Sequence, residues 1–109
     1  KSCGASLLDI NAGMPGIDEE KTLLNMISLI APQSSLPLVI DTTDPAAAEK
    51  ALRYYPGRAL LNSISGEETR LKQLLPAAAK YGAMFILLPI MDNRIPETAA
   101  ERIEIIKKI

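Results

Sequence analysis

"LPLVIDTTDP", residues 36–45, joins an apolar run to a polar tip and a proline. An apolar run without alternation is typical of a parallel strand that is buried on both faces. Asp44 can cap a helix that begins at Pro45, because the first helical position does not need the N–H that proline lacks. The stretch therefore predicts a strand that delivers Asp41 to the mouth of a pocket, followed by a helix over 45–55.

The same order of apolar run, polar tip and helix occurs in three more segments. Their apolar runs are "ASLLDINAG" (5–13), "ALLNSIS" (59–65) and "AMFILLPI" (83–90). The helical period predicts helices near 19–31, over 66–81 and from Pro96 to Ile109. The whole chain therefore consists of strand and helix in alternation.

Short signals define the faces and ends of these helices. In helix 19–31 the apolar residues that share one face are Leu23, Leu24, Ile27 and Ile30. Ser65 and Glu68 have the spacing of a capping box, and Gly82 ends the helix that follows them. In the last helix we expect Ile103 and Ile106 to face inward.

Strands that alternate with amphipathic helices pair in parallel through right-handed crossovers, so the fold class is α/β. The choice lies between a doubly wound open sheet and a (β/α)8 TIM barrel. The chain has no Gly-x-Gly-x-x-Gly turn and no Walker loop, and polar residues follow every strand, which favours the barrel. A complete barrel takes about 250 residues. We therefore expect residues 1–109 to form a partial barrel domain, a fragment of four βα units that makes up about half of a barrel.

Composition excludes several function classes. The formal net charge is −1 and no run of Lys or Arg is present, so nucleic-acid binding is not expected. One cysteine, Cys3, and no histidine exclude an internal disulfide, a zinc site and Ser-His catalysis. The longest apolar stretch, residues 83–91, is far shorter than the roughly 20 residues that span a bilayer. We expect a cytoplasmic protein without a metal site or a membrane partner.

Polar side chains follow each predicted strand, and the carboxyl ends of parallel strands meet at one edge. We expect Asp41 and Asn62 to bind a ligand, because a buried carboxylate or amide needs partners. The other polar residues at strand ends are Asp9, Asn11, Ser63, Asp92 and Asn93. Asp9 and Asn11 could instead satisfy backbone groups in the turn at Gly13. For Asp92-Asn93-Arg94 a solvated turn is the favoured interpretation.

Three stretches together resemble the pterin-binding barrel of corrinoid-linked methyltransferases, such as the methyltetrahydrofolate domain of cobalamin-dependent methionine synthase. They are residues 4–20, 36–68 and 74–109. The shared motifs are Asp-x-Asn-x-Gly, Ile-Asp-Ser/Thr with Thr42 as the hydroxyl residue, and Asn-Ser lying 21 residues beyond the Asp of the second motif.

The resemblance implies a substrate, a partner and part of a site. Asp41 and Asn62 would hydrogen-bond the pterin. Asp9 and Asn11 would line the same rim, and Ser63 would also belong to the substrate-binding site. The family reaction moves the N5 methyl group of methyltetrahydrofolate to cob(I)alamin carried by another domain or protein. The further pterin contacts of the family lie on later strands, so the resemblance assigns no residue of this chain to proton transfer at N5.

Two other interpretations remain open from the sequence. One is a dihydropteroate synthase-like enzyme, although the glycine- and serine-rich segment of that family is replaced by Asn11-Ala12-Gly13-Met14-Pro15-Gly16. The other is a catalytically silent half-barrel that serves as an assembly module. The two outer strands of a half-barrel have unpaired edges, so a homodimer is also expected.

Overall fold

The computed structural model describes residues 4–92 and 94–109, so Cys3 and Asn93 lie outside the described residues. In this part of the chain four strands alternate with four helices, which confirms the α/β fold and is consistent with half of a TIM barrel. The elements are β1 (Leu8–Asn11), α1 (Glu19–Ile30), β2 (Leu38–Asp41), α2 (Pro45–Tyr54), β3 (Leu60–Ser65), α3 (Glu68–Tyr81), β4 (Met84–Leu88) and α4 (Ala99–Lys108). None of the helices within the described ranges combines the length and the apolar character needed to cross a bilayer.

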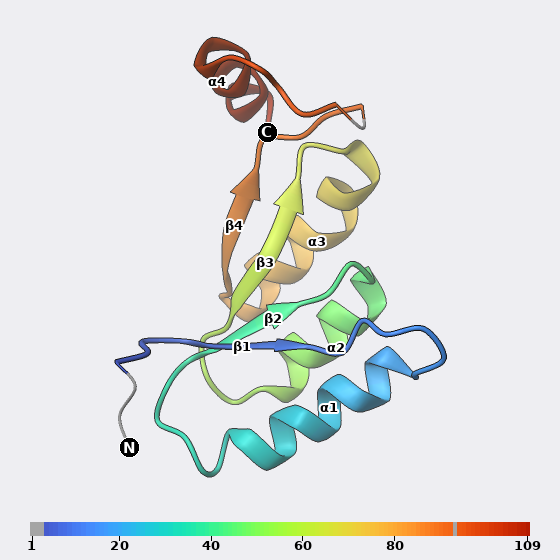
Figure 1. The fold of residues 1–109 in the computed structure, drawn as a ribbon, viewed down its shortest axis with the longest axis vertical. Coiled ribbons are helices and arrows are strands. Elements are labelled where there is room, and N and C mark those ends of the chain that lie inside the picture. Colours follow the sequence, from blue (N-terminus) through green and yellow to red (C-terminus); the bar gives the residue numbers. More distant parts are fainter. Residues whose placement is uncertain (1–3, 93) are drawn as a thin grey trace.

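The sheet follows chain order, β1-β2-β3-β4, and every neighbouring pair is parallel. Helices α1, α2 and α3 lie side by side on one face of it, while α4 lies beyond the carboxyl end of β4 (Figure 1). The register between β1 and β2 and between β2 and β3 is unbroken. Each of these strands therefore presents one set of side chains to the helices and the alternate set to the opposite face.

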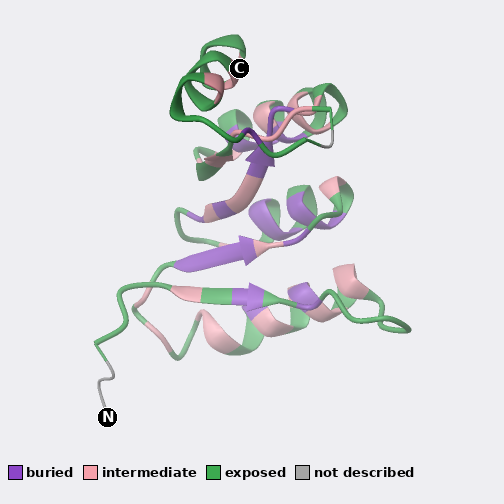
Figure 2. Ribbon diagram, turned by 45° about the horizontal axis from the view of Figure 1, so that its top comes forward, coloured by how far each residue is buried: buried purple, intermediate pink, exposed green. Residues whose placement is uncertain are grey.

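The core lies between the sheet and the three helices. Ile10, Ile40 and Leu61, one from each of the first three strands, are at most 2% exposed and belong to one packed cluster with Leu23 and Ile27 of α1. Figure 2 shows β2 as the most buried strand and α4 as mainly exposed. Complete burial of such a side chain contributes about 1.5–3 kcal/mol, so this face of the sheet cannot turn toward solvent without a large loss of stability.

The signals that begin α2 and end α3 are confirmed. The Asp44 carboxylate accepts a hydrogen bond from the Ala46 N–H at 2.9 Å, and Pro45 occupies the first turn of α2. Gly82 ends α3 in the left-handed conformation, with φ of 64°. The start of α2 and the end of α3 are thus determined by groups that lie within a few residues of each other in the sequence.

The predicted start of α3 was wrong. Ser65 does not cap a helix: it is the last residue of β3 and pairs with Leu88 of β4. The helix begins at Glu68, and the residue before it, Glu67, makes no side-chain cap. Strand pairing to β4 supplies partners for the Ser65 backbone, so the capping-box spacing is not used.

The start and the inner face of α4 also differ from the prediction. Thr98 caps the helix, and it forms a reciprocal capping box with Glu101, whereas Pro96 lies before the helix. The N–H groups of Glu97 and Thr98 donate to the Glu101 carboxylate, which lowers the pKa of that carboxyl.

Ile103 and Ile106 do not face inward, since they are 51% and 46% exposed. Instead Ile105 and Ile109 approach Gly66, where an added Cβ would lie 3.2 and 3.1 Å from them. The face of α4 that meets the molecule is thus one position away from the one that we predicted.

The apolar run 83–90 forms a strand, but that strand is not buried on both faces. Met84, Phe85, Ile86 and Leu88 of β4 are each 38–43% exposed. Strand β4 is at one edge of the sheet and pairs only with β3 among the described residues. Its sequence is suited to a more enclosed environment than this structure provides.

A buried threonine connects α1 to the loop after β2. Thr42 is 5% exposed, and its hydroxyl donates to the Glu19 carboxylate in the first turn of α1. The same hydroxyl oxygen accepts the Asp44 N–H at 3.1 Å. One side chain therefore holds the first turn of α1, the end of β2 and the cap of α2 together.

We predict that Thr42→Val lowers the free energy of unfolding by about 1–3 kcal/mol, because the change keeps the shape but leaves Glu19 and the Asp44 N–H without their partner. Thr42→Ser keeps the hydroxyl and should lose clearly less. Thr43→Val, at the exposed neighbouring position, should stay within about 0.5 kcal/mol of the wild type. Urea denaturation measures all three, and equal losses in the valine and serine variants would contradict the role of the hydroxyl.

Removal of the α4 cap gives a second test. Thr98→Ala should lower the free energy of unfolding by about 1 kcal/mol, the usual effect of losing a side-chain N-cap. Thr69→Ala is the matched control, because Thr69 is exposed in the first turn of α3 and caps no helix. If both variants have the stability of the wild type, the capping box does not stabilise α4.

Candidate functional site

Three polar side chains lie in one row across the sheet. Asn11 of β1 is in register with Asp41 of β2, and Asp41 is in register with Asn62 of β3. The residue before each of them is buried under the helices, so by strand alternation the row is on the face that the helices do not cover. Partners in register on parallel strands are direct neighbours, and the structure thus brings the two main predicted ligand residues together.

Two hydrogen bonds define the geometry of the row at its β1 end. The Asn11 side chain donates from Nδ2 to Oδ2 of Asp41 at 2.9 Å. Its Oδ1 accepts the Gly13 N–H at 2.8 Å. Since a backbone N–H needs an acceptor, this second bond assigns which end of the amide is oxygen. The alternative interpretation, in which Asn11 satisfies a backbone group in the turn at Gly13, is confirmed for Asn11.

The row is open to a ligand. Asn11 is exposed, while Asp41 and Asn62 are half-buried. Within residues 4–92 and 94–109 the Asn62 side chain makes no hydrogen bond, and its amide has both donor and acceptor capacity. The row can therefore accept and donate hydrogen bonds at the same time, which suits a flat polar heterocycle.

Asp9 and Ser63 lie near the row. Asp9 is exposed, two residues before Asn11 on β1, and pairs in register with Val39. Ser63 is half-buried, and its peptide bond to Asn62 is cis. Asn62 was predicted at the end of its strand, but β3 continues to Ser65 through a register shift between Leu61 and Ile64. This continuation is the reason why Asn62 lies within β3 while the other two members of the row end their strands.

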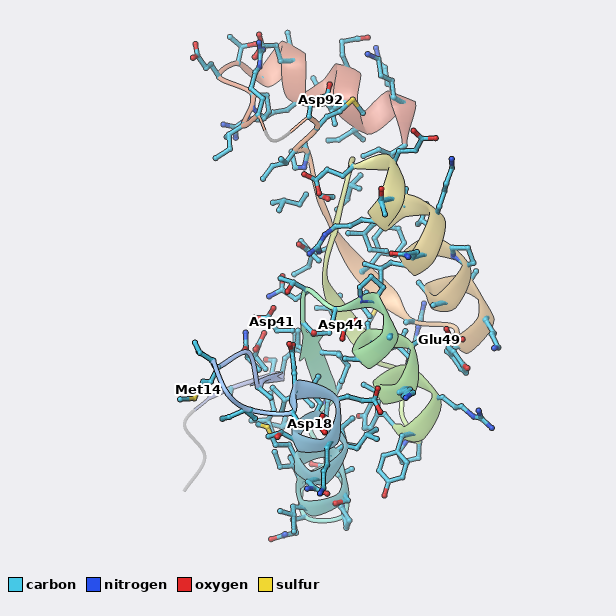
Figure 3. All side chains as sticks on the ribbon, turned by 90° about the vertical axis from the view of Figure 1, so that its right-hand side faces the viewer. Met14, Asp18, Asp41, Asp44, Glu49 and Asp92 are labelled. Atoms are coloured by element: carbon cyan, nitrogen blue, oxygen red, sulfur yellow. The ribbon has the colours of Figure 1, made fainter. Side chains whose placement is uncertain are left out.

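Asp92 does not join the row. It is exposed, has a left-handed φ of 54°, and lines a cavity together with the first residues of α3, whereas Asp41 ends β2 beside β1 (Figure 3). The twisted sheet separates the carboxyl end of β4 from those of β1 and β2. The expectation that the polar residues of all four strands converge was therefore wrong for Asp92, whereas the favoured interpretation of a solvated turn agrees with its exposed turn position. Asn93 is outside the described residues.

A cavity of about 570 Å³ lies at the carboxyl ends of β3 and β4. Its lining comes from the start of α3 and the loop after β4 and consists of Gly66, Glu67, Glu68, Thr69, Met91 and Asp92. Lys72 lowers the pKa of Glu68 through a hydrogen bond and its positive charge. The lining is acidic and does not include the row, so the cavity is separate from the predicted ligand residues.

Two residues near the site, Glu19 and Thr42, were noted in the sequence, but the hydrogen bond between them was not predicted. Thr42 was noted only for its hydroxyl, and Glu19 only as part of a helix. The position of Thr42 directly after Asp41 was an available signal. The pairing with Glu19, 23 residues earlier, left no local pattern.

Comparison with known proteins gives one family and several relatives. The family model described as pterin binding enzyme matches residues 2–109. Methionine synthase of Mycobacterium tuberculosis (strain ATCC 25618 / H37Rv) is 29% identical over 111 residues, which cover 97% of this chain and 9% of that protein. Methionine synthase of Mycobacterium leprae (strain TN) is 25% identical over 114 residues, again 97% of this chain and 9% of the relative.

Another relative is a methylcorrinoid:tetrahydrofolate methyltransferase of Eubacterium limosum. It is 29% identical over 106 residues, which cover 95% of this chain and 39% of that protein. The chain thus spans a minor part of each of these relatives. The family match covers nearly the whole chain and agrees with the resemblance in the motifs around Asp9, Asp41 and Asn62. The chain belongs to the family of pterin binding enzymes.

Proposed function

We propose that the row of Asn11, Asp41 and Asn62 is part of the site that holds methyltetrahydrofolate in a methyltransferase whose acceptor is a corrinoid. The observation that carries the proposal is the register, which puts a carboxylate between two amides on the open face of three parallel strands. The names of the relatives, methionine synthase and methylcorrinoid:tetrahydrofolate methyltransferase, support the same reaction class.

The chemistry of the row fits the edge of a pterin. That edge presents N–H donors beside ring-nitrogen and oxo acceptors. The Asp41 carboxylate only accepts hydrogen bonds, and the Asn62 amide both accepts and donates them. Charge-assisted bonds to a carboxylate are shorter and stronger than neutral ones. Together the two side chains can select the donor edge and the acceptor edge of the ring and fix its orientation.

Orientation is the contribution that this part of the protein would make to the reaction. A corrinoid, carried by another domain or protein, supplies the nucleophile that accepts the methyl group. As the bond from N5 to the methyl carbon breaks, N5 keeps the electron pair and takes up a proton. Amines leave poorly without that proton, so a pterin held in one orientation toward a proton donor reacts faster.

Binding measurements on the full-length protein test the proposal. Isothermal titration calorimetry with methyltetrahydrofolate should show micromolar affinity for the wild type. Asp41→Ala and Asn62→Ala should each weaken the affinity about 10- to 150-fold. This is the usual effect of losing a hydrogen bond to a charged group, and we expect a loss of the same size at Asn62. The free energy of unfolding should stay the same or rise, because polar groups on an open face are removed.

Matched controls separate the site from general effects of charge or surface. Asp92→Ala removes an exposed carboxylate beyond β4, and Asn25→Ala removes an exposed amide on α1. Both should bind as the wild type does. No binding in the wild type would favour the silent assembly module, and so would a large loss of stability in Asp41→Ala without a binding defect. Binding of a pterin pyrophosphate with p-aminobenzoate, instead of methyltetrahydrofolate, would favour the dihydropteroate synthase-like enzyme.

A further inference from the structure

We infer that Asn11 is a positioning residue: it fixes the Asp41 carboxylate through a side-chain hydrogen bond and acts on the pterin only through Asp41. The inference rests on the proposed function for the role of Asp41. It assigns Asn11 a different part from Asn62, although both are amides in the same row.

The first support is that both ends of the Asn11 amide are engaged within the protein. The Gly13 N–H holds Oδ1 at 2.8 Å, and Nδ2 donates to Asp41 Oδ2 at 2.9 Å. A rotation of the amide would break both bonds at once and would place two oxygens or two N–H groups against each other. The backbone turn at Gly13 therefore dictates that Asn11 presents a donor, and only a donor, to Asp41.

The second support is the effect on Asp41. The terminal torsion of an aspartate side chain is broad and has no strong intrinsic preference. The bond from Asn11 to Oδ2 restricts the rotation of the carboxylate, and Oδ1 is left to meet a ligand. The side chain of Asn62, on the other side of Asp41, makes no hydrogen bond to a described residue. The carboxylate is thus held from the β1 side and open toward the β3 side, where a ring that contacts both Asp41 and Asn62 would lie.

A double-mutant cycle tests the inference in the full-length protein. We expect Asn11→Ala to weaken methyltetrahydrofolate binding about 3- to 10-fold, the size of the penalty for ordering one side chain on binding. In an Asp41→Ala background the same change should have almost no effect, because there is no carboxylate left to position. Ligand-observed NMR gives the weak dissociation constants of the Asp41→Ala variants. If the effects of the two substitutions multiply instead, Asn11 contacts the pterin by itself and the inference is wrong.

A pH profile gives a readout that a purely structural role would not change. Asn11→Asp keeps the shape of the side chain but replaces the donor by a second carboxylate, so near pH 8 it should bind as weakly as Asn11→Ala or worse. Two carboxylates at this distance share a proton as the pH falls. That proton replaces the missing donor, so toward pH 5 the affinity of Asn11→Asp relative to wild type should recover, whereas that of Asn11→Ala should not. Parallel profiles for the two variants would overturn the inference.

The other charged groups near Asp41 should not produce this recovery by themselves. Asp9 lies on the same face of β1, and it is present in both variants. Glu19 approaches from α1 and bonds to Thr42, while Arg70 approaches from α3 and bonds to the Thr43 carbonyl at 3.1 Å. Because both variants keep all three groups, any difference between their pH profiles reports the group at position 11.

A measurement without ligand separates failure of this inference from failure of the proposed function. The NMR resonance of the Asn11 side-chain amide should move toward the position of a solvent-exposed amide in Asp41→Ala, with the Gly13 N–H resonance changing little. An Asn11 resonance that does not respond shows that the bond to Asp41 is absent, and this overturns the inference whether or not the protein binds methyltetrahydrofolate. A responding resonance in a protein that binds no pterin would overturn the proposed function instead, and with it the role in binding.

Discussion

The unshifted parallel pairing of β1, β2 and β3 is the constraint on which the site depends. Backbone hydrogen bonds put Asn11 beside Asp41 and Asp41 beside Asn62. A slip of one residue in β2 would turn Asp41 into the helix layer and Ile40 out of it. Because Ile40 is fully buried in the core, that slip would cost most of the stability of the fold. The burial of the core that stabilises the fold therefore also fixes the register that aligns Asn11, Asp41 and Asn62.

Features that depend on neighbouring residues could be predicted from the sequence. Asp44 caps α2 and Pro45 begins it because the bonding groups lie within two residues of each other. Gly82 ends α3 for the same kind of reason, since a left-handed residue is easiest for glycine. The placing of Asp41 at a strand end followed from the change from apolar to polar residues. In each case the competing conformations differ locally, and the local chemistry decides between them.

Features that depend on distant pairing could not be predicted in the same way. Ser65 has the spacing of a helix cap, yet it is held in β3 by pairing with Leu88. Asn62 lies within a strand for the same reason. The helical period predicted that Ile103 faces inward. The face of α4 that packs instead contains the residues that approach Gly66 closely. The bond between Thr42 and Glu19 likewise joins segments that carry no shared pattern.

For Asn11 the structural interpretation and the proposed functional role are compatible. From the sequence, a bond to the turn at Gly13 was an alternative to a role at the rim. In the structure the bond to Gly13 is what orients the amide, and an oriented amide is what holds one oxygen of Asp41. A site that binds a flat ring needs its carboxylate in place before the ligand arrives, since ordering it on binding weakens affinity. In the proposed site Asn11 thus preorganises Asp41: two hydrogen bonds link the Gly13 N–H, the Asn11 amide and the Asp41 carboxylate of the next strand.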